Sequence, residues 1–226
     1  MALLPTRNAV QKSYDAVAAD YAALTADELR QKPADARLLD KFAAALAGGG
    51  RCLDLGCGPG HLTAYLTQHG VETEGLDISR GMIKQARKRY PGLTFTQGDL
   101  WKMKYPDNCF AAVVAKDLLQ HVPADSLQDF FLEVRRIIEP NGALLIGFEG
   151  GIGAERPDTW LGHPVKLTFC FHRLVNVLVQ MQQAGFQQVG TYRRQPYPGI
   201  ERDQARIWIL AESLPGVPPA RKRQSL

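Results

Sequence analysis

Three glycines in the first third of the chain have a spacing that could hold a small ligand. They lie in the segment 53-LDLGCGPGHL-62 and are Gly56, Gly58 and Gly60. A short apolar run precedes them and a helix-like pattern follows. Glycine adopts positive φ and lets the backbone approach a ligand closely. The segment therefore predicts a binding turn at the carboxyl end of a buried strand.

The form of this glycine loop argues against two common phosphate-binding motifs. A dinucleotide fingerprint needs a small residue at the position of His61, and a P-loop needs Gly-Lys-Ser/Thr, which is absent here. Asp54, just before the glycines, is suited to attract a cationic amine. We expect a ligand without a pyrophosphate, and a tight strand–helix turn without any ligand stays open as the alternative.

Two more acidic residues end the next two predicted strands. Asp77 follows Gly56 by 21 residues, and Asp99 follows the third strand. A carboxylate in the first position accepts hydrogen bonds from both ribose hydroxyls. A carboxylate at the position of Asp99 could accept a hydrogen bond from an adenine amino group, and Leu100 would be an apolar contact for the ring. Each acid alone could be a helix cap or turn residue, but three acids at successive strand ends predict a nucleoside site.

The elements that must position these residues alternate between strand and helix. This alternation is typical of an α/β protein with a mostly parallel sheet, and the last two strands, with no helix between them, predict an antiparallel pair at its edge. Ser79 is the expected helix N-cap before residue 80, and 140–142 the expected turn into the fifth strand. We predict strands at 51–55, 72–77, 94–97, 110–115, 143–148, 186–194 and 205–211, and helices at 8–24, 36–47, 60–69, 80–90, 124–138 and 173–184.

Composition limits the class of protein. With 226 residues, 45% hydrophobic residues and a formal charge of +4, the chain is typical of a globular protein of about one domain. No apolar run approaches the roughly 18–20 residues of a membrane span, and the N-terminus lacks the features of a signal peptide. We therefore expect a cytoplasmic protein that does not associate with membranes.

The charge and the cysteines say little about partners. Part of the positive excess lies in 220–226, so a nucleic-acid partner is not favoured. The four cysteines form no CxxC pair and no zinc-ligand pattern, so we expect reduced thiols and no bound metal. A monomer and a homodimer are both left open.

Five segments, in this order, resemble the class I S-adenosylmethionine-dependent methyltransferases of the small-molecule type. They are 53–60, 75–83, 98–100, 110–122 and 133–146. The resemblance implies a Rossmann-like, seven-stranded sheet in the order 3-2-1-4-5-7-6 with helices on both faces. It also implies S-adenosylmethionine as methyl donor and a small-molecule acceptor methylated at O or N. The expected regions are an N-terminal helical lid (1–48), a core (49–212) with a substrate-loop insertion (149–172), and a flexible basic tail (213–226).

The resemblance also assigns donor-site roles. The backbone around Gly56 and Gly58 takes the methionine moiety, Asp77 the ribose, Ile78 the adenine face and Asp99 the adenine amino group. Lys116 stands where an apolar or aromatic residue is expected, so it could bring charge to the site or pair with an acid. The remaining expected donor contacts are Tyr14, Tyr21, Asp54, Cys57, Met82 and Leu100.

Methyl transfer from a sulfonium needs alignment more than acid–base chemistry, and a base helps only if the acceptor must lose a proton. His121 is the first candidate for a base or positioning group, with a packing role as its alternative, and His163 and His172 are further candidates. Three other groups belong to the same hypothesis: an aromatic cavity of Trp160, His163, Phe169 and Phe171, a rim with Glu201 and Arg202, and an ion-pair cluster of Glu28, Lys32 and Arg37.

Two other functions stay open. The chain could methylate RNA or protein through its basic tail, or it could bind the donor without methylating anything, as a sensor or a cyclase-like scaffold.

Overall fold

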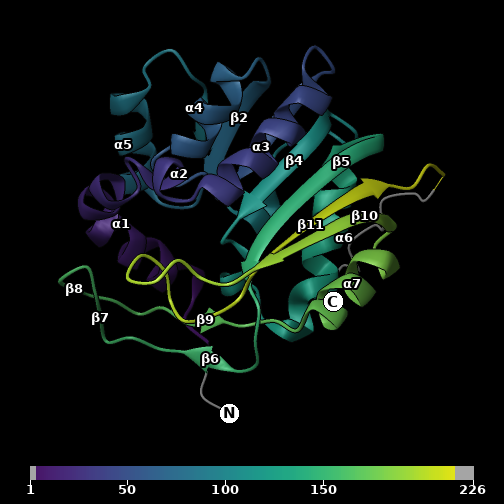
Figure 1. Cartoon of the computed structure of the whole chain (residues 1–226). Coiled ribbons are helices and arrows are strands. Elements are labelled where there is room, and N and C mark those ends of the chain that lie inside the picture. The colour runs from purple at the N-terminus through teal and green to yellow at the C-terminus, as the bar shows by residue number, and fades with distance from the viewer. Residues whose placement is uncertain (1–3, 217–226) are drawn as a thin grey trace.

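Seven strands form one sheet in the computed structural model, which describes residues 4–216 (Figure 1). Their order is β3-β2-β1-β4-β5-β11-β10, so the predicted order 3-2-1-4-5-7-6 is confirmed. The first five strands are parallel, and β11 is antiparallel to both of its neighbours. The strands are β1 (Arg51–Leu55), β2 (Glu72–Asp77), β3 (Phe95–Gln97), β4 (Phe110–Lys116), β5 (Ile138–Glu149), β10 (Phe186–Arg194) and β11 (Arg206–Ser213).

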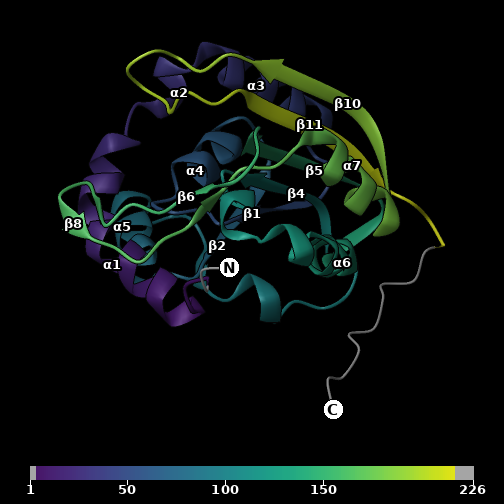
Figure 2. The same cartoon turned by 90° about the horizontal axis from the view of Figure 1, so that it is seen from below.

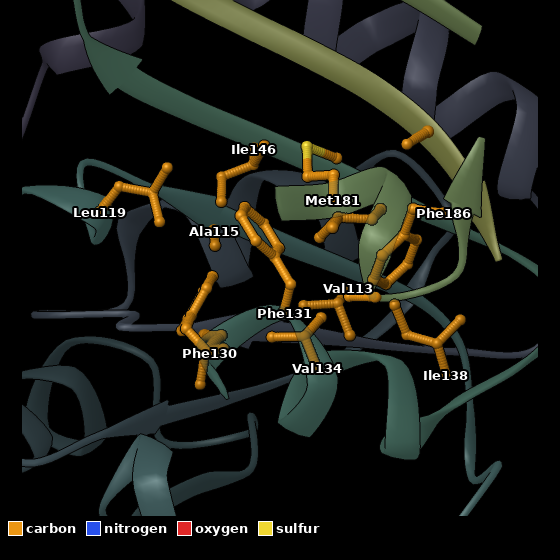
Figure 3. Close-up of a cluster of buried hydrophobic side chains, with 14 of the residues drawn as sticks. Val113, Ala115, Leu119, Phe130, Phe131, Val134, Ile138, Ile146, Met181 and Phe186 are labelled. Atoms are coloured by element: carbon orange, nitrogen blue, oxygen red, sulfur yellow. The ribbon is translucent and has the colours of Figure 1, made fainter. Parts of the chain in front are cut away.

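Helices cover both faces of this sheet, as expected (Figure 2). On one face, Phe130, Phe131 and Val134 of α6 and Met181 of α7 pack against the strands (Figure 3). On the other, α3 and α4 bury a second apolar cluster. Each fully buried side chain of this kind stabilises the fold by about 1.5–3 kcal/mol. The helices are α1 (Arg7–Leu24), α2 (Glu28–Gln31), α3 (Pro33–Leu46), α4 (His61–Gln68), α5 (Arg80–Arg89), α6 (Leu127–Ile137) and α7 (Leu174–Gln183).

Two local features fix the helices that follow β1 and β2. Ser79 caps α5 as predicted, because its hydroxyl accepts a hydrogen bond from the Met82 backbone N–H at 3.0 Å. Gly60 precedes α4 with φ +82°, and a Cβ there would lie 2.6 Å from Cζ of the buried Phe95 ring. Only glycine meets both demands, so the start of α4 is fixed relative to β3.

Three elements differ from the sequence prediction. The turn expected at Pro140–Gly142 lies inside β5, which already begins at Ile138, and it appears there as a register shift against β4 with Asn141 at φ +63°. The one-turn helix α2 was not predicted. The helix α3 begins at Pro33, three residues early, because proline suits the first helical position.

The segment 150–172 packs along α1 instead of forming a bare loop (Figure 2). Its four two-residue strands pair as β6 with β9 and β7 with β8. The Lys166 backbone N–H donates to the Ser13 hydroxyl at 2.8 Å, and His163 Nε2 lies 2.8 Å from the Asp20 carboxylate. The short strands are β6 (Ala154–Glu155), β7 (Thr159–Trp160), β8 (His163–Pro164) and β9 (Phe169–Cys170).

The sequence analysis also predicted a C-terminal tail from residue 213 and no membrane-spanning segment. The expected tail begins at Ser213, which is the buried last residue of β11, and its residues 217–226 lie outside the described part of the chain. Within residues 4–216, every helix is too short or too polar to cross a membrane.

Candidate active site

One cavity of about 400 Å³ opens at the carboxyl ends of β1, β2 and β4, beneath α1. This size is typical of small-molecule sites. The cavity brings together twelve residues that the sequence analysis assigned to the donor, and His121 with them. They are Tyr14, Tyr21, Asp54, Gly56, Cys57, Gly58, Asp77, Ile78, Met82, Asp99, Leu100 and Lys116.

The glycine loop is a turn that connects β1 to α4 and is hydrogen-bonded to the end of β2. The backbone N–H groups of Gly56 and Cys57 both donate to the Leu76 carbonyl, at 2.8 and 3.1 Å. Gly56 and Gly58 have φ +78° and +52°, and a Cβ at Gly56 would lie 2.9 Å from Cδ1 of Leu118. The loop therefore needs glycine to turn, and it exposes backbone to the cavity.

Asp77 closes this turn from the end of β2. Its Oδ2 accepts from the Gly58 N–H at 3.0 Å, and its Oδ1 accepts from the Ser79 N–H at 2.8 Å. Burial raises the pKa of Asp77 to about 6, although these two hydrogen bonds oppose the shift. Each oxygen keeps a lone pair, so the ionised carboxylate can accept from two hydroxyls of a ligand.

Asp54 lies deeper in the same wall, with only 1% of its surface exposed. Its Oδ2 accepts from the Thr63 hydroxyl at 2.7 Å, and burial raises its pKa to about 6. One carboxylate oxygen is therefore committed to α4, and the residue supplies negative charge to the back of the cavity.

Asp99 is already bridged to the N-terminal helix. Its Oδ2 lies 2.9 Å from Nη1 of Arg7, and its Oδ1 accepts from the Trp101 backbone N–H at 2.9 Å. The Arg7 guanidinium also lies over the Trp101 ring, 5.8 Å from its centroid. An adenine amino group would therefore share this carboxylate with Arg7.

Tyr14 and His121 meet across the cavity. The Tyr14 hydroxyl lies 2.5 Å from His121 Nε2, and the two rings form an edge-on pair with centroids 5.2 Å apart. Burial, and then the charge of Arg202, lower the pKa of His121 to about 4. Burial also raises the pKa of Tyr14. At neutral pH the pair is a protonated phenol beside an uncharged imidazole that can take up a proton.

Glu28 of α2 gathers three nitrogen groups behind the cavity wall. Its Oε1 lies 2.6 Å from Nζ of Lys32 and 2.8 Å from Nζ of Lys116, and its Oε2 lies 2.7 Å from His61 Nε2. Lys116 therefore pairs with acids, the second of its two expected roles. Of the expected ion-pair cluster, Glu28 and Lys32 are joined, whereas Arg37 is exposed.

Asp117 is a cavity residue that the sequence analysis did not assign. Its carboxylate lies 2.6 Å from Nζ of Lys116 and 3.3 Å from Nη1 of Arg206. Burial alone would raise its pKa, but these two cations outweigh burial and hold the pKa below its usual value. Its φ of +55° is uncommon for aspartate. Its position directly after β4 was the available sequence signal.

The histidines and aromatic residues of the insertion do not line the cavity. His163 is partly exposed beside Asp20, and the buried His172 bonds through Nε2 to the Leu119 carbonyl at 2.9 Å. The Trp160 centroid lies 5.7 Å from that of Tyr14 and 5.3 Å from that of Tyr21. The expected aromatic cavity is therefore wrong: these rings, with the buried Phe169, back the two tyrosines from outside, and Thr168 and Cys170 reach the cavity instead.

Residues 52–142 match the family model described as a methyltransferase domain. These residues are a methyltransferase domain, the kind of domain that the sequence resembles. The methyltransferase domain contains the glycine loop, Asp77, Asp99 and His121, whereas Tyr14 lies outside it.

Known proteins extend the likeness beyond the methyltransferase domain. The chain is 37% identical over 126 residues to trans-aconitate 2-methyltransferase of Methylobacterium nodulans, covering 54% of this chain and 45% of that protein. It spans about half the length of the curated relatives it matches.

Two solved structures share the fold over almost the whole chain. The (4+2)-cyclase SpnF has a TM-score of 0.73 at 19% identity, covering 93% of this chain and 98% of its own. Magnesium protoporphyrin IX methyltransferase from Synechocystis PCC 6803, solved with bound SAM, has a TM-score of 0.70 at 18% identity, covering 94% and 99%. At these identities the likeness extends to the fold alone.

Proposed function

We propose that this chain binds S-adenosylmethionine in the 400 Å³ cavity and transfers its methyl group to an oxygen or nitrogen of a small molecule. The observation that carries the proposal is the placement of the Tyr14–His121 pair in the same cavity as the glycine loop and Asp77. The residues proposed to bind the donor and a proton-accepting group thus face the same cavity.

The residues of the cavity fit the donor. Asp77 has two oxygens with free lone pairs for ribose hydroxyls, and the loop at Gly56 and Gly58 offers backbone without side chains. Ile78 and Leu100 supply apolar surface for the adenine ring. Acidic residues also outnumber cations along the wall, which favours a ligand that carries positive charge.

When bound, S-adenosylmethionine supplies an electrophilic methyl group on a sulfonium sulfur. The residues of this chain align the acceptor and manage its proton. As the acceptor's O–H or N–H bond breaks, its proton passes to the Tyr14 oxygen while the Tyr14 proton moves to His121 Nε2. His121 is uncharged before this transfer and becomes imidazolium after it, so the proton balance closes within the pair.

A small acceptor is favoured over RNA or protein because α1 and the segment 150–172 cover the cavity. The relative from Methylobacterium nodulans is named for a small-molecule substrate, trans-aconitate, which supports this class. The likeness to the cyclase concerns the fold alone, and the proton-accepting pair favours transfer over donor binding without methylation.

The test combines donor binding with a turnover assay on a panel of hydroxyl- and amine-bearing metabolites, with tRNA included. We expect S-adenosylmethionine to bind and at least one small molecule to gain a methyl group. Tyr14→Phe and His121→Ala should each slow turnover by about 10²–10⁴-fold while leaving donor affinity within a few-fold. Donor binding with no methylated product would favour the sensor or scaffold function, and methylated tRNA would favour the macromolecular one.

A further inference from the structure

Gln120 connects His121 to an arginine on a distant loop. The Gln120 side-chain Nε2 lies 3.3 Å from His121 Nε2. Its Oε1 lies 3.5 Å from Nη1 of Arg202, which belongs to the loop between β10 and β11. A chain of polar groups therefore runs from Arg202 through Gln120 to His121 and ends at the Tyr14 hydroxyl.

The direction of every hydrogen bond in this chain follows from its first member. A guanidinium can only donate, so the side of Gln120 that faces Arg202 must be the carbonyl oxygen. The amide NH₂ of Gln120 then faces His121, and because it can only donate, His121 Nε2 must accept. The Tyr14 hydroxyl, closer to the same nitrogen, donates to it as well.

Because Nε2 accepts, the proton of the uncharged ring belongs on Nδ1. His121 also hydrogen-bonds to the backbone of Thr168, and this contact favours the proton-bearing form of the ring.

We propose that Arg202 and Gln120 are positioning residues that hold His121 as its Nδ1–H tautomer, with the Nε2 lone pair aimed at the Tyr14 hydroxyl. This inference rests on the proposed function for its purpose, since that orientation leaves the Tyr14 oxygen free to accept a hydrogen bond from an acceptor's O–H or N–H. The tautomer itself is a property of the chain without any ligand.

Arg202 is held firmly enough to fill this role. Its guanidinium stacks on the buried Phe169 ring, 3.8 Å from the centroid, and the Phe169 ring lies 5.6 Å from that of His121. Two acids, Glu149 and Glu155, each lie 3.3 Å from guanidinium nitrogens of Arg202. The contacts with Phe169, Glu149 and Glu155 therefore hold the Arg202 side chain in place beside Gln120.

The charges that face His121 have opposing effects. The Arg202 charge disfavours imidazolium, whereas the Asp117 carboxylate favours it. Lys116 and Arg206 pair with Asp117 and offset its charge. Burial is the main reason that the pKa of His121 is low, and the Arg202 charge adds to it, so the ring is uncharged at neutral pH.

The test is ¹⁵N NMR of the histidine-labelled 226-residue chain without ligand, with His121→Asn to assign the His121 signals. We expect the Nδ1–H tautomer in the wild type and a protonation midpoint near pH 4. Arg202→Met should raise that midpoint, because a positive charge that disfavours imidazolium is lost. Arg202→Lys should keep the midpoint low, and Arg193→Met, an exposed arginine on β10, should leave it unchanged.

Gln120→Met gives an independent reading, since it removes the amide without altering charge, and it should increase the share of the Nε2–H tautomer. An Nε2–H tautomer in the wild type would overturn the inference, and so would an unchanged midpoint in folded Arg202→Met. Because these spectra need no donor or acceptor, they stand even if turnover is never found. The same variants assayed for turnover should move the acidic limb of the kcat profile in parallel.

Discussion

At the scale of single residues, the capacity of the cavity to bind a ligand depends on three carboxylates that have different hydrogen-bond and ion-pair partners. Asp77 accepts backbone hydrogen bonds through both oxygens, Asp99 shares its charge with Arg7, and Asp117 is paired with two cations. Among these three, Asp77 accepts only backbone N–H groups in the described part of the chain, so it has the most capacity to bind a ligand's hydroxyls.

Replacing Asp77 should weaken donor binding. A hydrogen bond to a charged group is worth about 1.5–3 kcal/mol, so Asp77→Ala should raise the Kd for S-adenosylhomocysteine by about 10–150-fold. Isothermal titration calorimetry measures this directly. Asp107→Ala is the matched control, because Asp107 is an exposed acid that pairs with Arg136 and does not line the cavity. Equal affinities in the two variants would remove Asp77 from the ribose site.

The affinity for the donor should also depend on pH. Burial raises the pKa values of Asp54 and Asp77 to about 6, so both carboxyls gain a proton as the pH falls through 6. The protonated forms lose negative charge and acceptor capacity, so the affinity for S-adenosylmethionine should be lower at pH 5 than at pH 7.5. Calorimetry across this range tests the sign. In Asp77→Asn the loss on acidification should be smaller, and tighter binding at pH 5 would contradict the electrostatic account.

At the scale of elements, α2 is held to the core by buried charge more than by apolar surface. Glu28 pairs with Lys32, which directly follows α2, and it also contacts Lys116 of β4 and His61 of α4. Arg194 and Glu201 extend this network to β10 and its following loop. The elements around the cavity entrance are therefore linked by ion pairs whose members depend on one another.

Removing Glu28 should destabilise the chain measurably. Breaking a buried ion pair costs about 3–5 kcal/mol, and the lower end is expected for Glu28→Ala because Asp117 and Glu201 still pair with the two lysines. Chemical denaturation gives the free energy of unfolding. The neighbouring Asp27→Ala removes an exposed pair with Arg30 and should cost less than about 1 kcal/mol. Similar losses in both variants would argue against a buried network.

Local patterns were enough to predict most elements but not how they dock. The strands, the Ser79 cap and the turn at Gly56 follow from apolar runs, a capping residue and closely spaced glycines, whereas the strand order was implied by the family resemblance. The Tyr14–His121 pair joins residues 107 positions apart, so it depends on how α1 docks. The one-turn helix α2 has no apolar period, and its place is set by the buried charge of Glu28.

The insertion illustrates the same limit. Its aromatic residues suggested a cavity lining, whereas Trp160 packs against Tyr14 and Tyr21, because the sequence could not tell which face of α1 the insertion would cover. The Lys166 and His163 contacts with α1 decide this, and both are long-range. Which residues reach the cavity, here Thr168 and Cys170, follows from that docking.

At the scale of the whole molecule, a ligand in the cavity touches most of the parts that fold together. Residues from α1, the glycine loop, β4 and the insertion all line the same space. Ligand binding should therefore stabilise the native state as a unit. At 100 times its Kd, S-adenosylhomocysteine should add about 2.7 kcal/mol, which raises the Tm of a chain of this size by roughly 5–10 °C. Differential scanning calorimetry checks this, and an unchanged Tm would mean that the cavity does not bind the donor's product.

The most direct test of the account is a crystal structure of the chain with S-adenosylhomocysteine. We expect the ribose hydroxyls within about 2.6–3.2 Å of the Asp77 carboxylate oxygens and the thioether sulfur on the side of Tyr14 and His121. A ligand bound elsewhere, or bound in this cavity with its ribose turned away from Asp77, would contradict the proposed site.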